Sequence, residues 1–159
     1  MPGQPPVNTV PVDSITLFIN TRPDRSTIGD IPGGFAIKTV AIKTPTPEIV
    51  KLDIKRLDSV NVPIPAGNVY KYLRIDSNET NFSFVEVVFD VANGWFDKNV
   101  RDDRTIGLIR YHSDTGWEKM DTYFVVGNAT HTQFRATLPG FSIFAIVSQS
   151  QSEKTMQAK

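Results

Sequence analysis

The chain of 159 residues has no cysteine and only two histidines, His112 and His131. Without cysteine there is no disulfide framework, no zinc site with thiolate ligands and no thiol nucleophile. A chain of this length buries roughly 70% of its unfolded surface on folding, so a hydrophobic core can form without covalent cross-links. The lack of cysteine therefore restricts the chemistry of the protein but does not exclude a location outside the cell.

An excess of charge of either sign is also lacking. Lysine and arginine together number 17 and aspartate and glutamate also 17, with no basic run among them. Nucleic-acid-binding surfaces concentrate basic side chains in a patch or stripe, so we expect no nucleic-acid partner. No segment has the length of apolar sequence that spans a membrane, and residues 1–6 lack the apolar region of a signal peptide. We expect signal and anchor segments to be absent from this chain.

What the sequence does contain is the alternation of apolar and polar residues typical of β-strands. Val50, Leu52 and Ile54, for example, alternate with charged neighbours between Glu48 and Leu57. This pattern predicts a strand with one buried and one solvated face, as in antiparallel sheets. Strands are predicted over residues 12–20, 34–43, 48–57, 69–76, 83–91, 105–112, 117–126, 131–138 and 141–148, with turn residues between them and one helical turn or two at 92–99.

These patterns predict an all-β protein: an antiparallel β-sandwich, immunoglobulin-like or jelly-roll-like, with about eight to ten strands and almost no helix. The domain is expected at residues 12–148. Residues 1–11 are expected to form an extended proline-rich lead-in, and residues 149–159 a polar C-terminal tail.

Five short motifs occur in the same order as in a known family. They are Val69-Tyr70-Lys71-Tyr72, the strand from Val85 that ends at Trp95, Leu108-Ile109-Arg110-Tyr111, Trp117 with Met120 and Thr122, and Pro139-Gly140-Phe141-Ser142 with its following strand. On these motifs the part of the chain from about Leu52 to Ser148 resembles the PGF-pre-PGF domain of archaeal cell-surface proteins. The resemblance implies an exported module that often precedes a C-terminal Pro-Gly-Phe sorting tail, and it implies no enzymatic role. This chain has no such tail after Ser148.

Two arrangements of residues suggest catalysis, and both have a simpler structural interpretation. A nucleophile elbow requires Gly-x-Ser-x-Gly, whereas Phe144 stands at the last position after Gly140 and Ser142. A catalytic triad can be assembled from Ser142, His112 and Asp114, but nothing in the sequence brings these residues together. We expect Pro139-Gly140 to form a tight turn and the following residues to pack as an inner strand. No catalytic residue, no cofactor and no enzymatic activity are expected.

Two further groups of residues suggest ligand binding. Trp95, Trp117, Tyr111 and Tyr123 would form an aromatic platform for sugar stacking if their rings were exposed and coplanar, and core packing is the other interpretation. Side-chain oxygen atoms are clustered at Asp97, Asn99, Asp102 and Asp103. This segment lacks the glycine and the distal glutamate of the EF-hand calcium loop. We therefore interpret them as a solvated turn and expect no metal site.

Candidate N-glycosylation sites follow the pattern Asn-x-Ser/Thr at Asn78, Asn81 and Asn128. All three fall at predicted turns or strand edges, where a glycan can be accommodated. Together with the resemblance they favour an extracellular, cell-surface setting.

The sequence thus predicts a non-catalytic structural module of an archaeal surface or envelope protein, with a spacer, assembly or adhesion role. Its expected partners are other surface or envelope proteins or itself, and glycans where the aromatic platform forms. Two alternatives remain: a carbohydrate-binding module, and a self-assembling sheath or pilus subunit. In the second, residues 7–20 would add as a strand to a neighbour's sheet edge.

Overall fold

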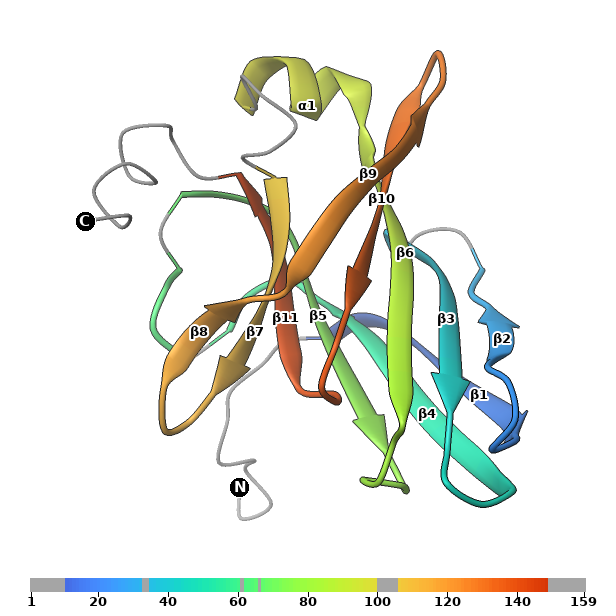
Figure 1. Cartoon of the computed structure of the whole chain (residues 1–159). Coiled ribbons are helices and arrows are strands. Elements are labelled where there is room, and N and C mark those ends of the chain that lie inside the picture. The colour runs from blue at the N-terminus through green and yellow to red at the C-terminus, as the bar shows by residue number, and fades with distance from the viewer. Residues whose placement is uncertain (1–10, 33–34, 61, 66, 100–105, 149–159) are drawn as a thin grey trace.

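The computed structural model describes residues 11–32, 35–60, 62–65, 67–99 and 106–148 (Figure 1). Within these residues the chain forms eleven β-strands and one short helix, α1 (Asn93–Asn99). Every strand pairing is antiparallel, so the predicted all-β antiparallel class is confirmed. The expected lead-in and tail lie outside the described residues, except that the first strand begins at Pro11. The described helix is too short and too polar to cross a membrane.

The strands form two open sheets. Sheet A contains, in spatial order, β1 (Pro11–Thr21), β4 (Glu48–Leu57), β5 (Asn68–Ser77), β11 (Ile143–Ser148), β7 (Ile106–His112) and β8 (Gly116–Lys119). Sheet B contains β2 (Thr27–Asp30), β3 (Ile37–Lys43), β6 (Phe84–Ala92), β10 (His131–Thr137) and β9 (Asp121–Gly127). The edge strands are therefore β1 and β8 in sheet A, and β2 and β9 in sheet B.

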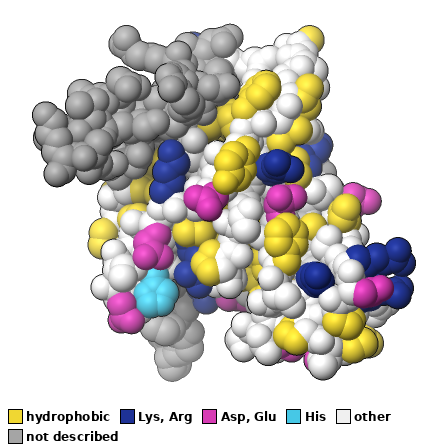
Figure 2. Space-filling view, in the orientation of Figure 1, with side chains coloured by type: hydrophobic (Ala, Val, Ile, Leu, Met, Phe, Trp, Pro, Cys, Tyr) yellow, Lys and Arg dark blue, Asp and Glu magenta, His cyan; other side chains and the backbone are white. Residues whose placement is uncertain are grey.

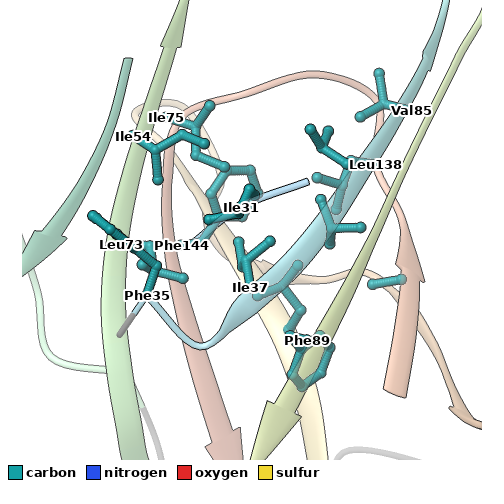
Figure 3. Close-up of a cluster of buried hydrophobic side chains, with 14 of the residues drawn as sticks. Ile31, Phe35, Ile37, Ile54, Leu73, Ile75, Val85, Phe89, Leu138 and Phe144 are labelled. Carbon is teal, nitrogen blue, oxygen red and sulfur yellow. The ribbon is translucent and has the colours of Figure 1, made fainter. Parts of the chain in front are cut away.

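The core lies between the two sheets, as the alternating residues predict. Leu52 and Leu73 from sheet A and Val87 and Phe89 from sheet B are fully buried in one cluster. Figure 3 shows side chains of both sheets pointing toward each other across this interior. Burial of this kind contributes about 25 cal/mol for each Å² of apolar surface removed from water, and it is the main force holding the sheets together.

The closing strand β11 is covered on both faces. Phe144 and Ile146 enter the main core, while Ala145 and Val147 pack with Ile109 in a second cluster on the outer face of sheet A. A strand in the middle of a sheet that is buried on both faces reads as a continuous apolar run, which is the pattern seen here. The interpretation of the residues after Pro139-Gly140 as an inner strand is confirmed.

Two strand predictions were wrong. The run 117–126 was predicted as one strand, but it forms β8 in sheet A and then β9 in sheet B, with the buried Met120 at the corner. Strand β2 was not predicted, because it has only four residues and Ile28 is its only large apolar residue. Alternation within a run cannot reveal that the chain changes sheets, because both halves keep the same local pattern.

Candidate functional site

The most unusual surface of the described structure is β9, an edge strand with four consecutive exposed apolar side chains. Tyr123, Phe124 and Val126 are each 52% exposed and Val125 is 43% exposed. No residue from Thr122 to Thr130 carries a charge. Figure 2 shows hydrophobic side chains along the course that β9 takes in Figure 1. Exposed apolar groups gathered in this way mark interaction sites more often than isolated ones do.

The apolar side chains of β9 project from both faces of sheet B. Tyr123 lies opposite Arg135 on the outer face, where the guanidinium is 5.7 Å from the centre of the tyrosine ring. Phe124 lies opposite the buried Phe134 on the inner face, with the two ring centres 6.1 Å apart. The strand is therefore apolar on both faces. Strand β7 lies beside its first residues, where the Thr122 hydroxyl accepts from the Leu108 N–H, and from Tyr123 onward its outer edge pairs with no strand in the described structure.

A β-bulge sets the directions of these side chains. The pairing of β9 with β10 shifts at this point, so that Phe124 faces Phe134 and Val126 faces Gln133, and Val125 is the extra residue. Because a bulge adds one residue to one strand, Tyr123 and Val126 both project from the outer face although they are three positions apart.

The other three edge strands have the usual protection against pairing with a foreign strand. Strand β1 begins at Pro11 and exposes the polar residues Asp13, Ser14, Thr16 and Asn20 on either side of Phe18. Strand β2 has four residues, and β8 has four residues of which Glu118 and Lys119 are exposed. Short length, charge and proline are the common means of protecting an edge. Strand β9 has seven residues, and Asp121 is its only charged residue.

The aromatic residues expected to form a sugar platform lie in three places. Trp117 and Tyr111 contact each other at an interplanar angle of 66°, and the Trp117 indole donates to the Pro63 carbonyl oxygen. Trp95 packs on Tyr70 and the main core at an angle of 54°. Tyr123 belongs to β9. Coplanar rings are required for a flat platform, and the structure does not arrange these four in that way.

The three candidate glycosylation sites differ in their surroundings. Asn78 bridges two elements, because its Oδ1 accepts from the Lys51 N–H and its Nδ2 donates to the Ile49 carbonyl oxygen. Asn128 shapes the turn between β9 and β10, because its Oδ1 accepts from the Thr130 and His131 N–H groups. Asn81 is exposed and lies in the same loop as Asn78, between β5 and β6. All three lie at turns or strand edges, as predicted.

The triad residues are closer together than the sequence indicated, but their hydrogen bonds do not suit catalysis. The Ser142 hydroxyl donates to the Tyr111 carbonyl oxygen at 2.8 Å. The Nδ1 atom of His112 accepts a hydrogen bond from the Asp114 N–H at 3.2 Å. The neutral ring therefore carries its proton on Nε2, which is the opposite of the tautomer that a general base facing a serine needs.

The residues considered for calcium binding lie largely beyond the described part of the chain. Asp102 and Asp103 fall outside the described residues, and of Asp97 and Asn99 only the backbone, in α1, is described. Among the residues that the structure does describe, no three histidine, aspartate or glutamate side chains come together as a metal site would require.

A pocket of about 280 Å³ lies beside the Pro139–Gly140 turn at one end of the sandwich. Arg110 lines it, donating from Nη2 to the Phe141 carbonyl oxygen at 3.4 Å, while its buried Nε meets no acceptor in the described structure. The carboxylates at the pocket are already bonded, Asp76 to Arg74 and Glu79 to the Asn81 N–H. The charged groups around this pocket thus bond mainly within the chain.

Comparison with known proteins gives no relative to set beside this geometry: no family model, no curated protein and no solved structure matches the chain.

Proposed function

We propose that the protein is a non-catalytic structural module that joins other proteins by accepting a β-strand at the edge formed by β9. The observation that carries this proposal is a mismatch between the sequence of β9 and its position. A run such as Tyr123-Phe124-Val125-Val126 is typical of a strand that is covered on both faces in the middle of a sheet. In the described structure the same run stands at an edge, half exposed.

Addition of a strand from another protein resolves this mismatch. The added strand bonds to the free N–H and C=O groups along the edge of β9, and its side chains cover the apolar groups on both faces. A partner that packs on one face alone would cover either Tyr123 and Val126 or Phe124, but not both sets. The proposal therefore specifies an extended strand as the partner element.

The setting that we propose is the archaeal cell surface or envelope, outside the cell. The five ordered motifs that resemble the PGF-pre-PGF domain support this setting, and so does the exposed sequon at Asn81. A module there serves as a spacer or assembly unit, and a sheet edge that accepts a strand gives it a means of assembly. The sequence suggested residues 7–20 as the strand-adding segment. In the described structure Pro11–Thr21 forms β1, itself an edge strand of sheet A, and we propose the β9 edge because its exposed side chains are apolar.

A strand peptide tests whether the edge accepts a strand. A synthetic peptide of residues 120–129, with two lysines added for solubility, is titrated into the isotope-labelled chain while amide NMR shifts are recorded. We expect the largest shifts in β9 and its neighbour β10, and small shifts in β1. A peptide of the same composition in scrambled order is the control. Shifts spread evenly over the molecule, or none at millimolar peptide, would count against the proposed function.

A further inference from the structure

We infer that the strand added at this edge is β9 of a second copy of the same chain, so that two copies pair antiparallel about a two-fold axis between Phe124 and Val125. This inference rests on the proposed function, because it names the partner of the same edge. A symmetric pair of this kind brings the same strand of each copy to the interface, which is the usual arrangement of homodimers.

The side chains of β9 are complementary to themselves in this register. Tyr123 of one copy lies opposite Val126 of the other, and both positions belong to the outer face of sheet B. Phe124 lies opposite Val125 at the centre of the pairing, which covers Tyr123 to Val126 and stops before Thr122, where β7 lies beside β9. In an antiparallel pair, residues directly opposite each other must share a face. The bulge at Val125 is what places Tyr123 and Val126 on the same face, so it permits this register.

The charges of β9 also suit pairing with itself. Asp121 is the only charged residue of the strand, and in this register it lies beyond the end of the pairing, on the side of Asn128 of the second copy and away from the other Asp121. Like charges directly opposite each other destabilise a strand pair. The Oδ1 atom of Asn128 is already used within its own turn. Its Nδ2 group is the part that would donate to the aspartate of the second copy.

Pairing of two β9 strands joins sheet B of both copies into one continuous sheet. The inner-face side chains then lie beside each other, and each copy supplies the apolar cover that the other lacks. One consequence concerns the sequon at Asn128. A glycan attached there would stand at the end of the paired strands, so use of this sequon and pairing through β9 exclude each other.

Two variants with matched chemistry test the inference by analytical ultracentrifugation of the full chain over a wide concentration range. Val126→Lys introduces a charge into the paired edge, which is a natural means of blocking strand addition. Phe18→Lys makes a comparable change at an exposed apolar residue of β1 and serves as the control. We expect wild type and Phe18→Lys to approach twice the monomer mass, and Val126→Lys to dimerise about tenfold more weakly or not at all.

The absence of native cysteine provides a second test that does not depend on the folding of the lysine variants. The double variant Tyr123→Cys/Val126→Cys places two thiols opposite two thiols in the proposed register, at a separation that a disulfide can span. Mild oxidation should give covalent dimers from this variant and far fewer from Phe18→Cys. Equal cross-linking of the two would overturn the register.

The outcomes separate the inference from the proposed function. Wild type that remains monomeric at every concentration, or a dimer that Phe18→Lys abolishes, overturns pairing through β9, and so does open-ended growth beyond the dimer. If the chain remains monomeric but the peptide of residues 120–129 still shifts the amide signals of β9, the edge accepts a strand and its partner is another protein. If the peptide fails as well, the proposed function fails with the inference.

Discussion

Two buried threonines show how single residues stabilise the fold at the point where β1 ends. The Thr21 and Thr44 hydroxyl oxygens lie 2.6 Å apart in the interior, and the Thr44 hydroxyl donates to the Thr46 carbonyl oxygen at 2.7 Å. Both side chains are almost fully buried. Buried polar groups are tolerated when they bond to each other. The Thr21 hydroxyl has the Glu48 carbonyl oxygen as a second partner, at 3.2 Å.

We expect Thr44→Val to lower the free energy of unfolding by about 1–3 kcal/mol, because it leaves the Thr46 carbonyl oxygen without its donor. The control is Thr16→Val, the same change at an exposed threonine that donates to Asp53. That variant should lie within about 0.5 kcal/mol of wild type. Urea unfolding measures both, and an equal loss in the two variants would contradict the role given to the buried pair.

Tyr72 makes stability depend on pH at the alkaline end. Its side chain packs beside Ile109, Ala145 and Val147 on the outer face of sheet A, and this burial raises the pKa of its phenol above the ordinary value. The unfolded chain ionises Tyr72 near pH 10, before the folded chain does. The contribution of Tyr72 is therefore fully present below about pH 10 and is lost as the pH rises through the raised pKa of the folded state.

Replacement of Tyr72 by phenylalanine should remove this dependence. Between about pH 9 and pH 11, the Tyr72→Phe variant should lose less stability than wild type, as measured by thermal unfolding. Tyr123→Phe, at a tyrosine that is exposed in the single chain, is the matched control in dilute solution and should follow the wild-type curve more closely. Parallel curves for wild type and Tyr72→Phe over this range would show that burial of the phenol has no such effect.

At the scale of the elements, β2 depends on a glycine where it meets β1. A Cβ atom added at Gly29 would lie 2.8 Å from the Cδ1 atom of Ile19, which is buried. Gly29→Ala should therefore destabilise the chain by about 1–2 kcal/mol, because the buried Ile19 side chain must shift within a packed core. Gly107→Ala also brings a Cβ within 2.8 Å of an atom, but this atom is near the end of the flexible Lys119 side chain. Gly107→Ala is the control and should be close to neutral. If chemical unfolding showed Gly107→Ala to be more destabilising than Gly29→Ala, the packing described would be contradicted.

The change of sheet between β8 and β9 depends on Thr122. The Met120 N–H donates to the Leu108 carbonyl oxygen, and the Thr122 hydroxyl accepts from the Leu108 N–H at 3.2 Å. The hydroxyl thus replaces a backbone acceptor at the point where the chain leaves sheet A.

Thr122→Val should cost about 1–3 kcal/mol, because the N–H of the fully buried Leu108 loses its acceptor. Thr137→Val, at an exposed position of β10, is the control and should be nearly neutral. Denaturant unfolding decides the matter. If Thr122→Val is as stable as its control, another acceptor satisfies the Leu108 amide.

How far the sequence predicts these elements depends on the kind of information each one needs. Strand β4 was predicted with its observed bounds, because Val50, Leu52 and Ile54 alternate cleanly with charged residues and turn residues stand on both sides. The corner at Met120 was missed, because a change of sheet requires tertiary contacts with Leu108 that leave no local pattern. Spacing within a strand predicts which residues share a face, but not which sheet the strand joins.

The candidate site was only partly predictable from the sequence. Tyr123 was predicted as part of an aromatic platform, and its role as an edge residue was not recognised. The available signal was the uncharged run of four large residues before Gly127, which is unusual for a strand next to solvent. This signal indicates a strand covered on both faces, and only the sheet order shows that β9 has a free edge.

At the scale of the whole molecule, the two sheets bring their edges together in pairs. Strands β1 and β2 lie beside each other, as the contact between Gly29 and Ile19 shows, and β8 continues directly into β9. One side of the sandwich thus has protected edges, and the other side has β9. A molecule built in this way has a single preferred direction for adding a strand, which leads to a closed pair more readily than to a chain of copies.

Hydrogen exchange measured by mass spectrometry, in dilute and in concentrated solution, is the most direct test that β9 is the edge at which strands add. Amide groups at an unpaired edge exchange quickly, and pairing with another strand slows them. We expect exchange in peptides covering residues 121–127 to slow as the concentration rises, while exchange in β1 does not change. Exchange in β9 that is equally fast at every concentration, or slowing that appears in β1 instead, would contradict strand addition at β9.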